Sequence, residues 1–228
     1  MKWPKQSPFS QFTTRRVNSA ITLRKTVGST MTPNPSYVVT TERLILRHWR
    51  ESDREPFARL NADPRVMEFM PHVLLKQESD ALADRIETHF QQHGFGLCAV
   101  ELRRGGAFIG FIGLNVPSFN AAFTPCVEVG WRLAADYWNQ GLATEGAREI
   151  VGYGFDVLGL EELVSFTVPA NVKSRRVMEK LRMTHEPSDD FDHPRLPAEH
   201  PLRRHVLYRL SRSAWNLEAP AGTKVRNG

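Results

Sequence analysis

The sequence has few cysteines, no long apolar run and no acidic residue in its first thirty positions. Only Cys98 and Cys126 occur among 228 residues, both in apolar stretches, which excludes a disulfide scaffold and predicts two buried thiols in a reducing compartment. No run of 18 apolar residues is present, so the sequence predicts neither a membrane span nor a membrane partner. We therefore expect a cytoplasmic protein.

Residues 1–30 contain no acidic side chain, so the excess positive charge of the chain lies in this segment. The chain has a formal net charge of +5, but these residues hold six Lys and Arg, so the other 198 carry 24 basic and 25 acidic side chains, a net charge of −1. The basic tail leaves open a nucleic-acid-binding hypothesis, whereas the nearly neutral remainder predicts no nucleic-acid partner. We expect residues 1–36 to be a disordered extension, either a transit peptide or sequence upstream of a start at Met31.

Hydrophobic periodicity and turn signals predict one mixed α/β domain over residues 37–216, followed by a tail at 217–228. Ser52 and Glu55 have capping-box spacing for a short helix, and Asp63-Pro64 is expected to begin another. A third, amphipathic helix is expected from Ser79 to His93, ended by Gly94. Strands are expected at 43–49, 96–102, 108–116, 126–133, 163–168 and 206–211, and further helices at 143–158 and 172–183.

Two common phosphate motifs are absent. No G-x-x-x-x-G-K-[ST] occurs, which argues against a nucleotide triphosphatase, and Gly152-Tyr-Gly154 lies inside an expected helix without the third glycine of a dinucleotide site. Instead, the strand 126–133 leads through a short turn into a helix that begins with the small residues Gly141 and Ala143. Exposed amides at such a helix start attract phosphate or pyrophosphate, although a tight turn that only lets the helix pack has the same pattern.

This turn carries a resemblance to a known family. Residues 137–145 are Tyr-Trp-Asn-Gln-Gly-Leu-Ala-Thr-Glu, which is similar to the [Q/R]-x-x-G-x-[G/A] signature of the GNAT N-acetyltransferase superfamily, with Trp138 at the first position as in the ribosomal-protein N-terminal acetyltransferases. Residues 171–183 resemble the family pattern N-x-x-S-x-x-x-x-E-K-x-G-[FM], with Arg182 in place of glycine. The segments 41–47 and 206–208 extend the resemblance over about residues 38–216.

The resemblance implies a fold, a cosubstrate and a reaction. The fold is a mixed, mostly antiparallel sheet flanked by helices and splayed between strands 126–133 and 163–168. The reaction is direct transfer of the acetyl group of acetyl-CoA to a primary amine in a ternary complex, without a metal. The residues implied in binding the coenzyme are Val129, Trp131, Leu133, Asn139, Gln140, Gly141, Ala143, Thr144, Asn171, Ser174 and Arg176.

The acceptor is left open. The branch implies the N-terminal α-amine of a protein, but it also contains enzymes for amino acids, polyamines and antibiotics. Residues 65–93 and 186–205, which are expected to line the acceptor side, carry both acids and bases, so their composition does not choose. A non-catalytic acyl-CoA sensor is a further hypothesis, and the oligomeric state is either monomer or homodimer.

Glu128 and Ser174 are the candidate catalytic residues. Glu128 is the only carboxylate of its strand and shares a face with Gly130 and Arg132, so it either draws the proton from the ammonium through a water or forms a salt bridge. By the resemblance, Ser174 protonates the leaving thiolate; alternatively its hydroxyl bonds the helix backbone behind an Asn171 cap. The resemblance also implies that a backbone N–H near Gly130 or Trp131 binds the oxyanion.

Three other sets of residues have a structural interpretation as well as a functional one. The cations of residues 172–183 either meet the 3′-phosphate of CoA or form a solvated face; they are Lys173, Arg175, Arg176 and Lys180. Cys126 is expected to be a small buried apolar residue and not a nucleophile. The spacing of His193, His200 and His205 matches no zinc pattern, so we expect no metal site, and the loop 191–201 is expected to cover the acceptor pocket.

Overall fold

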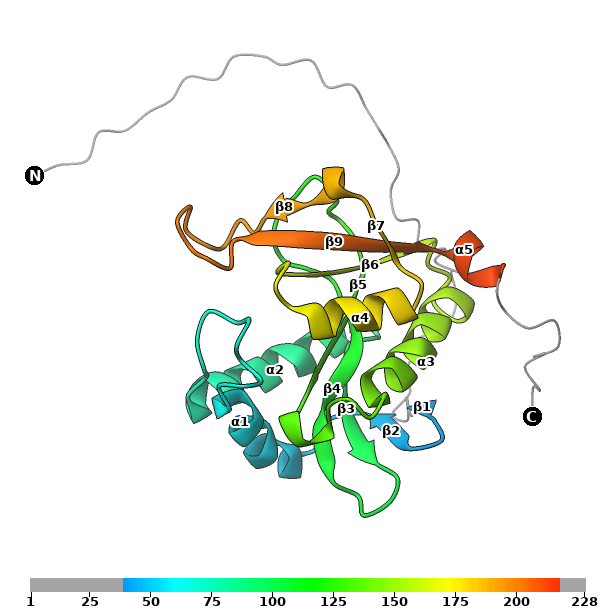
Figure 1. The fold of residues 1–228 in the computed structure, drawn as a ribbon. Coiled ribbons are helices and arrows are strands. Elements are labelled where there is room, and N and C mark those ends of the chain that lie inside the picture. The colour runs from blue at the N-terminus through cyan, green and yellow to red at the C-terminus, as the bar shows by residue number, and fades with distance from the viewer. Residues whose placement is uncertain (1–38, 218–228) are drawn as a thin grey trace, which may run out of the picture. The chain divides into compact units, whose positions relative to one another are not determined.

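The computed structural model describes residues 39–217, and the predicted extension 1–36 and nearly all of the tail 217–228 lie outside them. Nine strands form the sheet in this part of the chain, in the order β1-β2-β3-β4-β5-β6-β9-β7, with β8 paired to β9 (Figure 1). All neighbouring strands are antiparallel except β5 and β6, which are parallel. The strands are β1 Val39–Thr40, β2 Leu44–Arg47, β3 Leu97–Leu102, β4 Phe108–Asn115, β5 Glu128–Leu133, β6 Glu162–Thr167, β7 Thr184–His185, β8 Phe191–Asp192 and β9 Arg204–Ser211.

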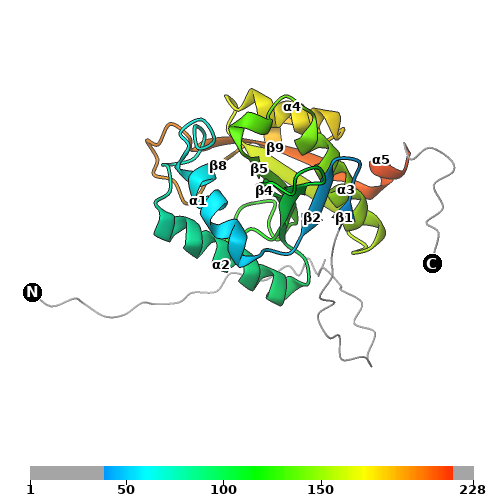
Figure 2. The same cartoon turned by 90° about the horizontal axis from the view of Figure 1, so that it is seen from below.

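Helices cover both faces of the sheet (Figure 2). The α-helices are α1 Arg54–Ala62, α2 Lys76–His93, α3 Leu142–Asp156, α4 Val172–Lys180 and α5 Arg212–Asn216. Side chains of a strand point alternately to the two faces, so neighbours on β4 enter different cores. Phe111 packs with Phe57 of α1 and Ile86 of α2, whereas Ile112 belongs to the larger core with α3.

A buried arginine ties β2 to the start of α1. Arg47 is only 5% exposed and donates to both oxygens of Asp53 at 2.7 and 2.9 Å and to Glu101 at 2.7 Å. The hydrogen bond to Asp53 is the main reason that the pKa of Arg47 lies above its ordinary value. The fold therefore gives this buried cation two carboxylates, as a buried charge requires.

Several predicted helix boundaries are wrong. Ser52 and Glu55 form no capping box, because α1 begins at Arg54 and Asp53 before it makes no side-chain cap bond. The Asp53 carboxylate instead accepts the Arg50 N–H at 2.8 Å at the start of the short 3-10 helix Glu51–Asp53. Asp63 ends α1 instead of beginning a helix, and its side chain accepts the N–H of Arg65 at 2.9 Å in a turn. The next helix begins at Lys76, three residues before Ser79.

The remaining predicted elements are present, with ends shifted by a few residues, and β1, β7, β8 and α5 were not predicted. The predicted helix 172–183 ends at Lys180 because Arg182 has a left-handed φ of +62°. The Arg182 N–H donates to Glu179 and the Met183 N–H to Met178, which is the hydrogen-bond pattern of a Schellman helix end. Arg182 thus keeps the conformation of the glycine that it replaces.

Candidate active site

The parallel strands β5 and β6 separate after a single pair. Glu128 is in register with Val164, whose N–H donates to the carbonyl of Val127 at 2.9 Å. No further pair joins the two strands in residues 39–217. The predicted splay is therefore present, and it opens an edge of β5 in the middle of the sheet.

The direction of the backbone groups along that edge follows from the pairing of β5 with β4. Ala134 donates its N–H to Ile109 at 2.9 Å, and residues that bond the partner strand alternate with residues that do not. The main-chain groups of Val129, Trp131 and Leu133 therefore point away from β4 and into the gap. Main-chain donors in this position suit the amides of an extended chain such as pantetheine.

The start of α3 presents free amides. Gly141 precedes the helix with a left-handed φ of +79°, and no side chain caps this end. The first main-chain bond runs from Glu145 to Gly141 at 3.0 Å, so the N–H groups of Leu142, Ala143 and Thr144 have no acceptor within the helix. Because these amides and the helix dipole attract an anion, the residues present fit a pyrophosphate.

A carboxylate holds this turn against the first strands. Glu145 accepts hydrogen bonds from the Thr41 hydroxyl and from the backbone N–H and Nε of Arg43, the last two at 2.9 and 2.6 Å. Arg43 also donates to the carbonyl of Gln140 at 2.8 Å. Two segments that resembled the family separately, 41–47 and 137–145, are thus parts of one hydrogen-bonded unit.

Replacing Glu145 by glutamine is expected to raise the KM for acetyl-CoA a few-fold and to reduce the free energy of unfolding by about 1 kcal/mol at pH 7. Partial burial acts to raise the pKa of Glu145, but the hydrogen bonds from Thr41 and Arg43 hold it below its ordinary value. A lowered carboxylate pKa stabilises the fold above the unfolded-state pKa, and this contribution disappears as the pH falls through the folded value. Denaturation at pH 7 and at pH 3 should therefore show the difference between Glu145→Gln and wild type only at pH 7.

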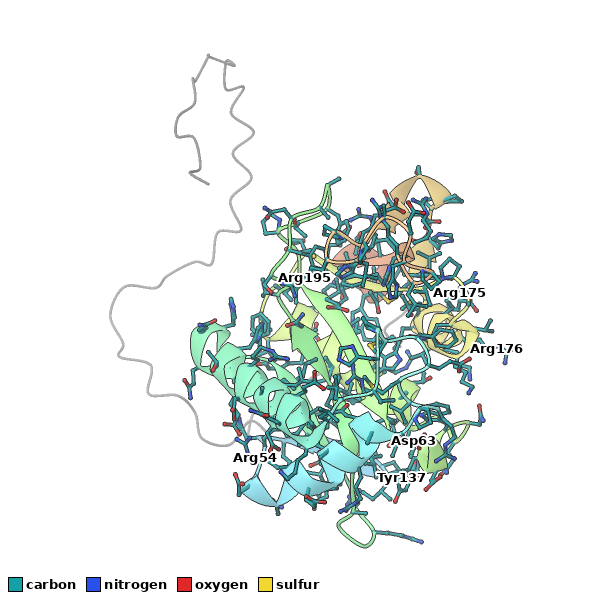
Figure 3. All side chains as sticks on the ribbon, turned by 90° about the vertical axis from the view of Figure 1, so that its left-hand side faces the viewer. Arg54, Asp63, Tyr137, Arg175, Arg176 and Arg195 are labelled. Carbon is teal, nitrogen blue, oxygen red and sulfur yellow. The ribbon has the colours of Figure 1, made fainter. Side chains whose placement is uncertain are left out.

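A cleft of about 300 Å³ joins β5, the turn before α3, the start of α4 and the loop after α1. Figure 3 shows Tyr137 and Asp63 below α4, on this side of the molecule. All but two of the predicted coenzyme residues line the cleft: Trp131, Leu133, Asn139, Gly141, Ala143, Thr144, Asn171, Ser174 and Arg176. The side chain of Val129 is buried in the core, and that of Gln140 donates to the carbonyl of Asp136 at 3.1 Å.

Several lining residues were expected only within the range 65–93 on the acceptor side or, for Arg132, only as a neighbour of Glu128 on its strand. The loop after α1 contributes Arg65, Val66, Glu68, Phe69 and Met70, and β5 contributes Arg132. Trp138, noted only as a departure from the signature, donates its Nε1 to Leu133 at 2.8 Å, and Lys173 lies 4.1 Å above its ring. Trp138 stabilises the turn at the position where the family signature has a polar side chain. This replacement of a polar residue by tryptophan was the feature of the sequence that could have pointed to its role.

The first turn of α4 directs a serine hydroxyl into the cleft. Asn171 caps the helix by accepting the Ser174 N–H at 3.2 Å, and it donates to Thr167 at 3.0 Å. Within residues 39–217, the Ser174 hydroxyl has no hydrogen-bond partner, so the backbone bond considered as its alternative role is absent.

The cations of α4 divide between two sides of the helix. Lys173, Arg176 and Lys180 line the cleft. Arg175, labelled beside Arg176 in Figure 3, donates to the Tyr208 hydroxyl at 3.2 Å and to the carbonyl of Pro169. Three of the four predicted cations therefore lie beside the proposed coenzyme site.

Glu128 projects from the face of β5 that is turned to α1 and α2, and it does not line the cleft. Its partner is the Asn115 amide, which donates to Oε2 at 3.2 Å, and no cation of residues 39–217 forms a salt bridge with it. Burial raises the pKa of Glu128 to about 7, against the opposite effect of the Asn115 hydrogen bond. The salt bridge to Arg132 considered from the sequence is thus absent.

The histidine and cysteine candidates lie outside the cleft. The rings of His193 and His205 are 5.1 Å apart, and within residues 39–217 no group of three His, Cys, Asp or Glu side chains is arranged to hold a metal.

Cys126 is only partly buried, not fully as expected, and desolvation raises the pKa of its thiol to about 12. Arg195 donates to the carbonyl and hydroxyl of Ser118, so the loop 191–201, which does not line the cleft, packs against the segment before β5.

No helix of the described segment 39–217 combines the length and the apolar character needed to cross a membrane.

The chain has relatives that match this architecture. Residues 43–184 match the family described as Acetyltransferase (GNAT) domain. Over 204 residues, 82% of this chain and 81% of the relative, it is 30% identical to the FsC-acetyl coenzyme A-N(2)-transacetylase of Aspergillus fumigatus. An acetyltransferase structure from Agrobacterium tumefaciens str. C58 is 26% identical with a TM-score of 0.61, covering 76% of this chain and 93% of that one.

The fold also matches RimJ of Mycobacterium smegmatis, solved in complex with CoA-disulfide, at 17% identity and a TM-score of 0.64, over 82% of this chain and 91% of that one. The predicted family and fold are confirmed by these matches, and GNAT acetyltransferases use acetyl-CoA. The chain belongs to the GNAT acetyltransferase family and is an acyltransferase.

Proposed function

We propose that this protein acetylates a primary amine by direct attack of the amine on acetyl-CoA in a ternary complex. One observation carries the proposal: β5 bears both a carboxylate with a pKa of about 7 and main-chain N–H groups that face the open gap. Acetyl-CoA supplies a thioester carbonyl, to which the amine nitrogen forms a bond while the bond to sulfur breaks. For this reaction the chain must remove a proton from the ammonium before the attack, bind the oxyanion that the attack creates, and protonate the thiolate as it leaves.

Glu128 is the proposed general base. An N-terminal α-amine has an ordinary pKa near 8, so most of it is protonated at pH 7 and must lose a proton before it attacks. A carboxylate with a pKa of about 7 matches that donor far better than an ordinary glutamate. The proton passes from the ammonium to Glu128 through a water.

The oxyanion donor is the N–H of Trp131. Gly130, considered together with it from the sequence, is paired with Gly113 of β4 and directs its main-chain groups to that strand. Trp131 is the next residue and directs its N–H into the gap, beside the lining of the cleft. Its position supports the proposal that it stabilises the developing negative charge.

Replacing Ser174 by alanine is expected to lower kcat about fivefold and to leave the KM for acetyl-CoA nearly unchanged. The effect is modest because a thiol with a pKa near 8.5 leaves readily without full protonation. The cap uses the Ser174 backbone N–H, so the helix start survives the change. Steady-state kinetics beside Ser188→Ala, an exposed serine outside the cleft, provides the check, and an unchanged kcat would remove Ser174 from the mechanism.

The three cleft-lining cations of α4 are the proposed site for the 3′-phosphate of CoA. Lys173, Arg176 and Lys180 follow at helical spacing on one side of α4 and border the turn proposed for the pyrophosphate. Their charge and the free amides of α3 favour the same polyanion.

Two acceptor classes have support. The fold match to RimJ and the resemblance to ribosomal-protein N-terminal acetyltransferases favour a protein α-amine. The 30% identity to an enzyme named FsC-acetyl coenzyme A-N(2)-transacetylase, a name that mentions no ribosomal protein, keeps a small-molecule amine as the second class.

Release of free CoA, measured with a panel of N-terminal peptides and small amines, separates these classes. Turnover with peptides alone supports the first class and turnover with small amines alone supports the second. Binding of acetyl-CoA without turnover on any amine would overturn the proposed function in favour of a sensor. A protein whose melting temperature acetyl-CoA does not raise would contradict the coenzyme site as well.

A further inference from the structure

Arg132 is a half-buried cation that has no carboxylate partner within residues 39–217. It projects from the same face of β5 as Glu128 and donates to Asn61 Oδ1 at 2.7 Å and to the sulfur of Met70 at 3.3 Å, with its guanidinium 5.4 Å from the ring centre of Phe111. Within residues 39–217 no carboxylate forms an ion pair with it. Burial lowers its pKa to about 10, so it is still charged at neutral pH.

Arg47, which is buried, shows how this fold treats a structural cation. Arg47 has two carboxylate partners, Asp53 and Glu101, both at 2.7 Å. Arg132 has a neutral amide oxygen, a thioether and a ring in their place. Because Arg132 is half-buried, lines the cleft and has no opposite charge inside the protein, its guanidinium is available to an anion that enters the cleft from outside the chain.

The position of Arg132 limits where that anion comes from. Its side chain lines the cleft together with Met70 of the loop after α1. It lies on the face of β5 that also carries Glu128, whereas the coenzyme is proposed to contact the gap-facing backbone and the start of α3. The anion therefore belongs on the side of the amine acceptor.

Gly130 separates the two charged groups along the strand. A Cβ at Gly130 would be in van der Waals contact with Glu128 Oε1 at 3.8 Å and Leu97 Cδ2 at 4.0 Å, so the carboxylate reaches over the glycine toward Arg132. Residues four apart in a strand have Cα atoms roughly 13 Å apart. An acceptor whose nitrogen lies near this carboxylate can therefore extend along the strand toward the guanidinium.

Building on the function proposed above, we propose that Arg132 binds a carboxylate of the acceptor, which is an amine that carries this group several bonds from its nitrogen. The planar guanidinium suits a carboxylate because it donates two parallel hydrogen bonds. The class includes peptides with an acidic residue close to a free N-terminus. It excludes polyamines, which would bring a second cation to Arg132.

Matched acceptors test the proposal directly. Ala-Asp-amide and Ala-Asn-amide, and the same pair with one more alanine in front, differ only in the carboxylate. With the wild-type protein, kcat/KM is expected to be at least tenfold higher for the aspartate member of one pair. Arg132→Gln is expected to bring that ratio to about one, while Arg59→Gln, on the exposed side of α1, keeps it.

A second variant keeps the arginine in place. Asn61→Asp gives Arg132 a carboxylate from within the chain at the position of the present 2.7 Å hydrogen bond. This variant is expected to melt at a higher temperature than wild type and to lose the preference for the aspartate peptides. Because Asn61→Asp keeps Arg132, its melting temperature and its peptide preference together test the proposal even if Arg132→Gln does not fold.

The outcomes separate this inference from the function on which it rests. Equal turnover of both members of each pair by the wild-type protein would overturn the carboxylate assignment and leave the acetyltransferase proposal intact. A preference that survives in Arg132→Gln, or a loss confined to the KM for acetyl-CoA, would overturn it as well. Absence of turnover with any amine would instead count against the proposed function.

Discussion

Replacing Glu128 by glutamine is expected to lower kcat at pH 7 by about 100-fold, which is the usual contribution of a general base. Glutamine keeps the size of the side chain and a hydrogen bond to Asn115 but accepts no proton. At pH 9 most of an α-amine has already lost its proton in solution, so the deficit is expected to shrink. The wild-type kcat should rise with pH through the Glu128 pKa of about 7, and this rise should be absent from the variant.

The same substitution is expected to stabilise the fold. Burial raises the pKa of Glu128 from 4.5 to about 7. Between these pH values the Glu128 carboxyl ionises in the unfolded state but stays largely protonated in the native state. The native state is therefore destabilised increasingly as the pH rises through this range, and fully above pH 7. Glutamine removes that cost, which is roughly 3 kcal/mol at pH 8 because each pKa unit corresponds to about 1.4 kcal/mol.

Chemical denaturation at pH 5 and pH 8, beside the pH profile of kcat, tests both expectations. Glu149→Gln, an exposed glutamate of α3, is the control and should change neither quantity. A pH profile that keeps its shape in Glu128→Gln would remove this carboxylate from the mechanism, whatever the stability measurement shows.

Replacing Gly141 by valine is expected to raise the KM for acetyl-CoA by about 100-fold, because the variant disturbs amides that hydrogen-bond a charged group. Gly141 has a φ of +79°, which a β-branched residue adopts only with strain, and a Cβ there would lie 3.5 Å from Arg43. The side chain would also stand in front of the free N–H groups of Leu142 and Ala143. Kinetics at saturating amine give the change in KM.

The chain contains a closely matched control for this prediction. Gly159 has a φ of +72°, and a Cβ there would lie 3.6 Å from Arg212, so Gly159→Val introduces similar backbone strain away from the cleft. The two variants should lose similar stability in thermal denaturation, and only Gly141→Val should lose affinity for the coenzyme. An equal rise of KM in both would mean that destabilisation, and not the lost amides, is the cause.

The long strands and helices were predictable because each of them has a clear period and clear ends. The helix that ends at His93 is an example, since Gly94 follows with a φ of +75°. Helix starts were less predictable. Asp53 is shared between Arg47 and the Arg50 N–H, and a partner on a neighbouring strand cannot be inferred from local spacing.

Most of the residues that the resemblance implied for the coenzyme and that line the cleft lie in two continuous segments, 137–145 and 171–183, so a local pattern could single them out. The proposed acceptor side is assembled differently. Arg132, Asn61 and Met70 come from a strand, a helix and a loop, and nothing in the sequence marks Asn61 as the partner of an arginine 71 positions away. The absence of a counter-charge at Arg132 is visible only once the carboxylates around it are placed.

The alternation of β5 has a consequence for how this protein can change over generations. The main chain at 129, 131 and 133 faces the gap whatever side chains it carries, while the side chains at 128, 130 and 132 face the other way. On the proposed assignment, substitutions at the second set alter the choice of amine without removing any main-chain contact to the coenzyme. A single strand can thus explore new acceptors by point mutation while the contacts to the cosubstrate are retained.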